Sequence, residues 1–101
     1  MKIYPLTIED TFVQPLIDNG VSKVVKFSFP RGKILKKHKA PSALLLFVAQ
    51  GKIRFTAGKE AEISTAQMVS LDAEVEHALE ALEDSVVVLI LTPSPNAHPL
   101  L

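Results

Sequence analysis

The sequence predicts an all-β domain whose strands form a sandwich or a barrel. Short segments rich in β-branched and aromatic residues are separated by turn signals about every ten residues. The longest uninterrupted apolar runs cover only residues 43–49 and 86–91. This rhythm of short strands is typical of two packed sheets or a closed barrel. The 101 residues are enough for a single hydrophobic core, and no linker or internal repeat divides them.

The first half of the chain supplies two apolar strands with a polar segment between them. Residues 21–29 (VSKVVKFSF) form the first strand, and Pro30 ends it because proline cannot donate a hydrogen bond to a sheet. A turn and the lysine-rich segment 33–39 follow. The lysines indicate a solvated edge strand or, alternatively, a rim that binds an anionic ligand. Pro41 separates this segment from the apolar strand 43–49.

Glycine marks two further turns. Residues 50–51 join strand 43–49 to residues 52–56, which alternate polar and apolar side chains, and this arrangement predicts a hairpin. A second turn is expected at residues 57–60. Three more strands are expected at residues 61–64, 67–71 and 86–92, the last of them fully buried.

Residues 72–86 carry two conflicting signals. The apolar side chains recur at helical spacing, at Val75, Leu79, Leu82 and Val86. The strands expected on both sides favour a further strand, in which His77, Leu79 and Ala81 would share one face. We predict a strand over residues 75–83, because pairing with neighbouring strands routinely overrides local propensity.

Composition excludes several classes of function. Lysine plus arginine and aspartate plus glutamate both number 11, so the chain lacks the basic field that nucleic-acid binding needs. The absence of cysteine excludes disulfides and thiolate chemistry. No apolar run approaches the roughly 20 residues of a membrane helix, and no long apolar stretch marks a signal peptide. We therefore expect a cytoplasmic protein with no nucleic-acid or membrane partner.

Two of the three histidines lie in predicted strands. His38 closes the lysine-rich segment and His77 lies in the ambiguous one, whereas His98 belongs to a proline-rich tail. If the strands form one barrel, both imidazoles could meet inside it. Neutral imidazole is a good ligand for divalent transition metals. The alternative is a pair of barrel histidines that simply hydrogen-bond to side chains or water.

The spacing around these histidines resembles the two motifs of the cupin superfamily. In the first motif, which runs Gly, His-X-His, Glu, Gly, the residues Gly32, His38 and Gly51 fall in register. In the second motif, which runs Gly, Pro-X-Gly, His, Asn, the histidine position is taken by His77. The resemblance covers roughly residues 20–92.

The resemblance implies a cupin double-stranded β-helix, which is a jelly-roll barrel, as a single domain over residues 1–101. The core would span about residues 20–92. Residues 1–19 would form an N-terminal strand or dimer segment, and residues 93–101 a tail. Small cupins commonly pair as dimers, so the resemblance also implies a homodimer.

Several motif positions depart from the cupin pattern. Cupin metal sites typically use three histidines and one glutamate, but Ala40 takes the second histidine position, and Leu44, or Leu45 with a longer spacing, takes the glutamate position. In the second motif the departures are Ala66 and Glu74 at the two glycines, Asp72 at the proline and Ala81 at the asparagine.

These departures imply a degenerate metal site. A site formed by His38 and His77 alone would hold zinc, nickel, manganese or iron only weakly, since catalytic zinc sites usually have three protein ligands. Glu74 is a conceivable additional ligand. We expect no tightly bound cofactor.

Three functions are compatible with such a barrel. The first is a small-molecule-binding module with little or no catalysis, anchored by His38 and His77. Its apolar lining would be Phe27, Phe29, Leu44, Leu46, Phe55, Leu71 and Leu79. The second is a metal-dependent enzyme of the cupin type, such as an isomerase, lyase or dioxygenase, with an incomplete two-histidine site. The third is a structural or interaction subunit with a filled barrel.

Overall fold

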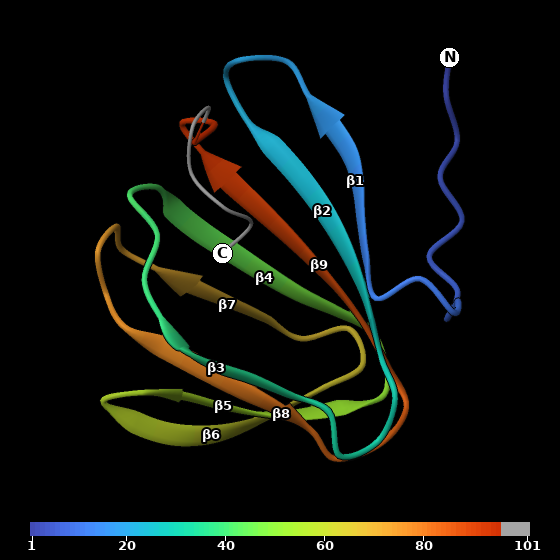
Figure 1. Ribbon diagram of the computed structural model, residues 1–101, viewed down its shortest axis with the longest axis vertical. Coiled ribbons are helices and arrows are strands. Elements are labelled where there is room, and N and C mark those ends of the chain that lie inside the picture. The colour runs from blue at the N-terminus through green and yellow to red at the C-terminus, as the bar shows by residue number, and fades with distance from the viewer. Residues whose placement is uncertain (96–101) are drawn as a thin grey trace.

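Two antiparallel β-sheets face each other in the computed structural model, which describes residues 1–95 (Figure 1). The strands are β1 (Val13–Asp18), β2 (Lys23–Phe29), β3 (Ile34–His38), β4 (Ala43–Gln50), β5 (Lys52–Ala57), β6 (Lys59–Ser64), β7 (Met68–Leu71), β8 (His77–Ala81) and β9 (Ser85–Thr92). The larger sheet has the order β1-β2-β9-β4-β7 and the smaller one β3-β8-β5-β6. The predicted all-β fold is confirmed. Among the described residues, no helix is long and apolar enough to cross a membrane.

The core fills the space between the sheets. Alternate residues of β2, β4 and β9 point inward from the larger sheet, as the period of two in a strand requires. The innermost side chains are Val25, Phe27, Phe29, Leu44, Leu46, Val48, Val87, Leu89 and Leu91 from the larger sheet and Ile53, Phe55, Leu79 and Ala81 from the smaller one. Phe27, Phe29 and Phe55, which the sequence places in the apolar lining of the barrel, belong to this core.

The ambiguous segment contains a strand, as predicted. Strand β8 lies between β3 and β5, with Leu79 opposite both Leu35 and Phe55. His77, Leu79 and Ala81 are buried, whereas Ala78 and Glu80 are half-buried on the other face. The helical spacing was misleading because pairing on both edges and burial of one face outweigh the intrinsic preference of a short segment. Likewise β3 is an edge strand, and its lysines are exposed.

The predicted hairpin at residues 50–51 is wrong. Strand β4 belongs to the larger sheet and β5 to the smaller one, so Gly51 turns the chain from one sheet to the other. Gly51 has a φ of 92°, and a Cβ there would collide with Ser85 Oγ and lie 2.5 Å from the Asp84 carbonyl oxygen. A hairpin and a corner between sheets both need a glycine with positive φ, so the local signal could not separate them. The second expected turn forms, and it is the tip of a hairpin between β5 and β6 with Gly58 at its centre.

The backbone supports the motif alignment at two non-glycine residues. Ala66 has a φ of 69° and Glu74 a φ of 68°. Left-handed backbone conformations are costly for residues with a Cβ and are routinely adopted by glycine. Both residues occupy positions where the second cupin motif has glycine. Positive φ at both positions therefore agrees with the alignment, because glycine would adopt this conformation without strain.

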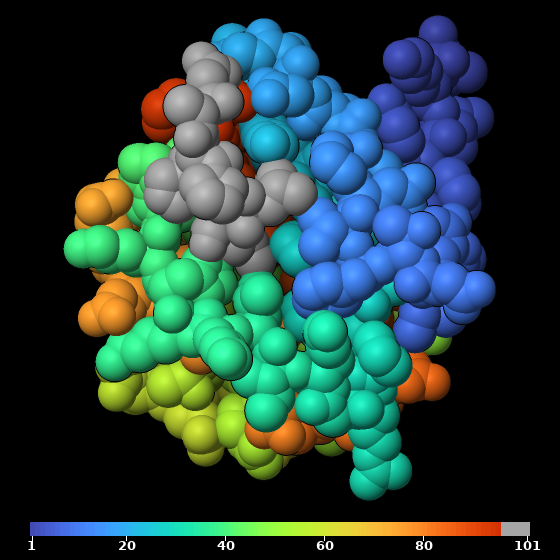
Figure 2. All heavy atoms as spheres, in the orientation of Figure 1, coloured from blue at the N-terminus to red at the C-terminus, as the bar shows by residue number. Residues whose placement is uncertain are grey.

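The N-terminal residues cover part of the larger sheet. Strand β1 pairs with β2 of the same chain, and the preceding residues form one side of the molecule (Figure 2, dark blue). The Glu9 amide donates to Ser28 Oγ over 3.0 Å. Lys26, only 1% exposed, has its ammonium 3.4 Å from Glu9 Oε2 and 3.4 Å from the Pro5 carbonyl oxygen. A dimer role for residues 1–19 stays a prediction.

The start of the expected tail is attached to the domain. Ser94 is buried, its amide donates to the Val21 carbonyl, and its hydroxyl donates to Asp18 Oδ1 over 2.7 Å. The hydrogen bond from Ser94 lowers the pKa of Asp18 below its ordinary value, and one from the Gly20 amide adds to this effect. His98 lies outside the described residues.

Candidate functional site

His38 and His77 meet where β3 ends and β8 begins. They lie opposite each other in the antiparallel β3–β8 pair. Their ring centroids are 4.4 Å apart, with an angle of 60° between the ring planes. His77 is only 3% exposed and stacks on Phe55, with 5.8 Å between the centroids. The predicted convergence of the two imidazoles is therefore confirmed.

Each imidazole is oriented by a backbone carbonyl two residues before it. His38 Nδ1 lies 2.5 Å from the Lys36 carbonyl oxygen, and His77 Nδ1 lies 3.0 Å from that of Val75. A carbonyl oxygen only accepts hydrogen bonds, so each neutral ring carries its proton on Nδ1. Both Nε2 atoms are then left with a free lone pair.

These two Nε2 atoms are the unusual feature of the site. Among the described residues, both are buried and neither has a hydrogen-bond partner. Two lone pairs cannot bond to each other, and buried polar atoms without a partner are rare in folded proteins. The pair is therefore chemically able to accept hydrogen bonds from a donor or to coordinate a cation.

Burial favours the neutral form of His77 by lowering its pKa. Removal from solvent lowers its pKa below the ordinary value, the hydrogen bond to the Val75 carbonyl opposes this shift, and the nearby His38 adds to it. A lowered pKa leaves the Nε2 lone pair available at neutral pH.

Comparison with known proteins identifies the fold. An RmlC-like cupin from Desulfovibrio desulfuricans superimposes with a TM-score of 0.81 at 21% identity, over 93% of this chain and 98% of that one. The chain has the cupin fold. An RmlC-like cupin with a double-stranded β-helix fold from Methanocaldococcus jannaschii gives a TM-score of 0.79 at 17% identity, over 95% of this chain and 94% of that one.

A longer protein contains the same barrel. A cupin 2 conserved barrel domain protein from Leptotrichia buccalis is 28% identical with a TM-score of 0.75, over 79% of this chain and 39% of that one. No protein-family model and no curated protein sequence matches the chain. The assignment of the fold therefore rests on the structural likeness.

The two histidines fit a metal ion only in part. Ala40 and Leu44, at the other two ligand positions of the motif, are buried and apolar. Leu44 faces the interior whereas Leu45 is 37% exposed, so Leu44 takes the inward position. Glu74 is exposed on the turn before β8, where its amide donates to the Ala40 carbonyl over 2.8 Å. Within residues 1–95, no three His, Cys, Asp or Glu side chains are grouped so as to hold a metal.

The predicted lining residues all lie in the interior. Six of them are at most 4% exposed, namely Phe27, Phe29, Leu44, Leu46, Phe55 and Leu79, and Leu71 packs against them half-buried. They form the cluster that fills the barrel, and Phe55 connects this cluster to the imidazole of His77. Their role in ligand binding stays a prediction.

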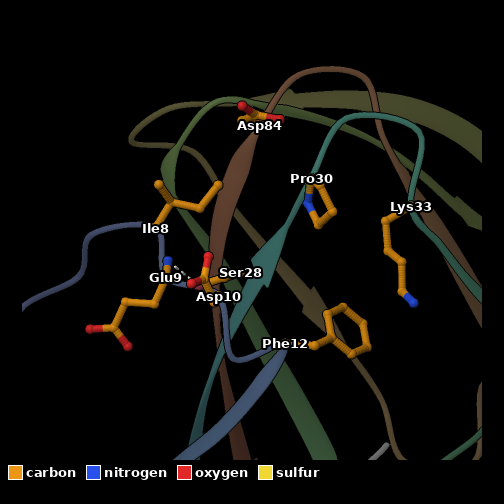
Figure 3. A pocket seen from close by; sticks show the side chains of 8 residues that line it. All are labelled: Ile8, Glu9, Asp10, Phe12, Ser28, Pro30, Lys33 and Asp84. Carbon is orange, nitrogen blue, oxygen red and sulfur yellow. Dashed lines mark hydrogen bonds between the residues drawn. The ribbon is translucent and has the colours of Figure 1, made fainter.

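A cleft of about 460 Å³ lies elsewhere on the barrel and was not predicted from the sequence. Its lining residues are Ile8, Glu9, Asp10, Phe12, Ser28, Pro30, Lys33 and Asp84 (Figure 3). They come from the N-terminal segment, from β2 and the turn after it, and from the turn before β9. No local pattern in the sequence relates these three segments, so only their packing reveals the cleft.

Proposed function

We propose that this cupin binds a small molecule at the His38–His77 pair and has little or no catalytic activity. The observation that carries the proposal is the pair of buried Nε2 atoms without partners. Leaving a buried acceptor unsatisfied costs about 1–3 kcal/mol, and a ligand that donates to both atoms would recover much of that cost. Phe55, stacked on His77, would supply apolar surface beside these two polar anchors.

The lack of a third ligand supports binding over catalysis. Within the described residues, no carboxylate or further imidazole joins the histidines. Ala40 and Leu44 offer no group that could hold a metal or move a proton. A metal-dependent cupin enzyme would need side chains that hold the metal and side chains that move a proton.

A weak divalent metal site is the second candidate, and the Nδ1 contacts favour it. Histidines that bind metals usually donate the other ring N–H to a carbonyl or carboxylate, which is the arrangement of both rings here. His38 and His77 would hold the ion. A bound ion would supply a Lewis acid that polarises an oxygen of the ligand.

Imidazole NMR tests both candidates. Long-range ¹H–¹⁵N spectra of the protein, treated with chelator, are recorded while a library of small polar fragments is added. We expect binding fragments to shift Nε2 of His38 and His77, and His77→Gln to abolish the response. Lys37→Met, on the exposed side of β3, serves as the matched control and should respond like the wild type. Fragments that bind without moving either imidazole would overturn the proposal.

The same spectra distinguish a metal from an organic ligand. Zinc or nickel added without fragments should shift both Nε2 resonances only if the second candidate holds. If fragments shift the Nε2 resonances only after metal is restored, the histidines bind a metal ion. If fragments shift these resonances in the presence of chelator, the histidines bind the ligand directly.

We also propose that the chain forms a homodimer. The outer face of the larger sheet carries Met68 at 61% and Leu45 at 37% exposure, paired across the strands with half-buried Phe47 and with Ser70. Apolar patches of this kind often mark interaction sites, and a second copy would cover this one. Sedimentation equilibrium should report a dimer that Met68→Lys weakens, while Lys37→Met leaves it intact. A monomer at all concentrations would contradict the proposal.

A further inference from the structure

The cleft outside the barrel interior is built from parts that are held in place. The Ser28 amide donates to the Phe12 carbonyl over 3.0 Å, and the Glu9 amide donates to Ser28 Oγ over 3.0 Å. Together with the Lys26–Glu9 ion pair, these contacts attach the N-terminal segment to β2. The cleft wall formed by residues 8–12 is therefore preorganised.

The opposite wall is held by two turns. The Gly32 amide donates to the Ala81 carbonyl over 2.8 Å, and the Ala81 amide donates to the Lys33 carbonyl over 2.9 Å. The Arg31 amide donates to Asp84 Oδ1 over 2.8 Å, which connects the turn before β3 to the turn before β9. Rigid walls reduce the ordering cost of binding.

Phe12 provides an aromatic surface in this cleft. Its ring makes edge contacts with Phe27 and Phe29, with centroids 5.4 and 5.0 Å away. Lys33 Nζ lies 4.6 Å from the centroid of the Phe12 ring. Phe12, Pro30 and Ile8 supply apolar surface for a ligand of modest size (Figure 3).

The cleft also contains charges of both signs that are not paired with each other. Among residues 1–95, neither Asp10 nor Asp84 forms a salt bridge, and the Lys33 ammonium forms none either. In Figure 3, Asp10 and Lys33 lie on opposite sides of the cleft, and Asp84 lies at its top. Glu9, by contrast, is compensated by Lys26.

We propose that this cleft binds a small zwitterion, a molecule that joins an ammonium and a carboxylate through a short apolar body. The ammonium would lie by Asp10, the carboxylate by Lys33 on the opposite side, and the apolar part against Phe12. A ligand with one charge would leave the opposite charge of the cleft unmatched, whereas a zwitterion complements both. The volume of about 460 Å³ lies within the roughly 300–1,000 Å³ typical of small-molecule sites.

This site is separate from the histidine pair and goes beyond the proposed function. Lys33 precedes β3 and His38 ends it, so the two sites lie at opposite ends of that strand. Nothing that binds the cleft needs to touch an imidazole.

Three probes that share one apolar body test the charge requirement. They are leucine, its decarboxylated analogue 3-methylbutylamine and its deaminated analogue 4-methylpentanoate. Backbone ¹H–¹⁵N spectra should show the largest shifts at residues 8–12, 30–33 and 84. We expect leucine to bind tightest, the amine next and the acid least, because two unpaired carboxylates face one ammonium. No shifts at these residues up to the solubility of leucine, or equal affinity for all three probes, would overturn the proposal.

Charge variants separate recognition from structural damage. Asp10→Asn and Lys33→Met should each raise the Kd for leucine by about twofold to fivefold, as expected for partly exposed charge pairs. Asp10→Asn should weaken the amine but not the acid, and Lys33→Met should weaken the acid but not the amine. Loss of affinity for both analogues in each variant would indicate a structural effect and contradict the proposal. His77→Gln should leave leucine binding unchanged, so failure at the histidine site is distinguishable from failure at the cleft.

Discussion

His38 and His77 lie opposite each other in the β3–β8 pair, and each directs Nδ1 to a carbonyl two residues earlier in its own chain segment. The same kind of contact, from Nδ1 to a local backbone carbonyl, thus orients both rings, and the Nε2 atom of each ring is buried. Backbone carbonyls direct both Nδ1 atoms, and the ring of His77 also stacks on Phe55.

The buried His77 should make the fold sensitive to acid. Its pKa is lowered in the folded state, mainly by burial, so the unfolded chain takes up a proton at higher pH than the folded one. The contribution of His77 to the free energy of unfolding should be constant above about pH 7 and should fall as the pH drops through about 6.5. The slope from this residue is at most about 1.4 kcal/mol per pH unit. Urea unfolding at several pH values measures it. His77→Gln should flatten the profile between pH 5 and 7, and an unchanged profile in the variant would contradict this assignment.

Gly51→Ala should strongly destabilise the fold. The added Cβ would collide with Ser85 Oγ and approach the Asp84 carbonyl oxygen to 2.5 Å, at a residue whose φ is 92°. Strain and overpacking together should reduce the free energy of unfolding by roughly 3 kcal/mol.

Gly58→Ala is the matched control for this substitution. Gly58 also has positive φ, at 77°, but nothing lies within 4 Å of its Cβ position. Gly58→Ala should lower the free energy of unfolding only by the conformational strain, about 1 kcal/mol. Equal losses in the two variants, measured by urea denaturation, would show that the corner at Gly51 is not tightly packed.

Glycine at Ala66 or Glu74 should stabilise the protein. Both residues have positive φ, near 69° and 68°, where a Cβ is unfavourable. Replacement by glycine should raise the free energy of unfolding by about 0.5–1 kcal/mol, after the greater entropy of glycine in the unfolded chain is subtracted. Ala61→Gly, at an exposed position of the edge strand β6, should instead lower it. Thermal and urea unfolding of the three variants provide the comparison, and a loss of stability in Ala66→Gly would refute the strain argument.

Restoring the missing ligands should create a stronger metal site. Ala40→His combined with Leu44→Glu adds an imidazole and a carboxylate at two buried motif positions. Affinity for zinc or nickel should rise at least about tenfold, because the ion gains two ligands and a compensating negative charge. Calorimetric titration measures the change, with Ala40→His alone as a second variant in case the buried acid is not tolerated.

Leu45→Glu is the control for this double substitution. It places the same acid on the exposed side of the same strand, and metal affinity should not change. Near-stoichiometric metal in the native protein, by elemental analysis of a sample purified without chelator or tag, would contradict the expectation of a weak site. It would also favour the metal-dependent candidate.

Much of this molecule is determined by the sequence alone. Alternation of apolar residues specifies the strands, and the positions of Phe27, Phe29 and Phe55 specify the core. The motif spacing around His38 and His77 also predicts that the two imidazoles meet, as they do. These features are predictable because strand faces and motif spacing are written in residues that lie close together in the chain.

Other features were decided only by tertiary packing. The glycine signal at Gly51 could not show which sheet the next strand would join, since that depends on strands far away in the sequence. The helical spacing of residues 72–86 was overridden by pairing with β3 and β5. The cleft beside Phe12 exists only because three distant segments pack together. Local sequence specifies how a segment folds and which face is apolar, but long-range contacts decide what that face meets.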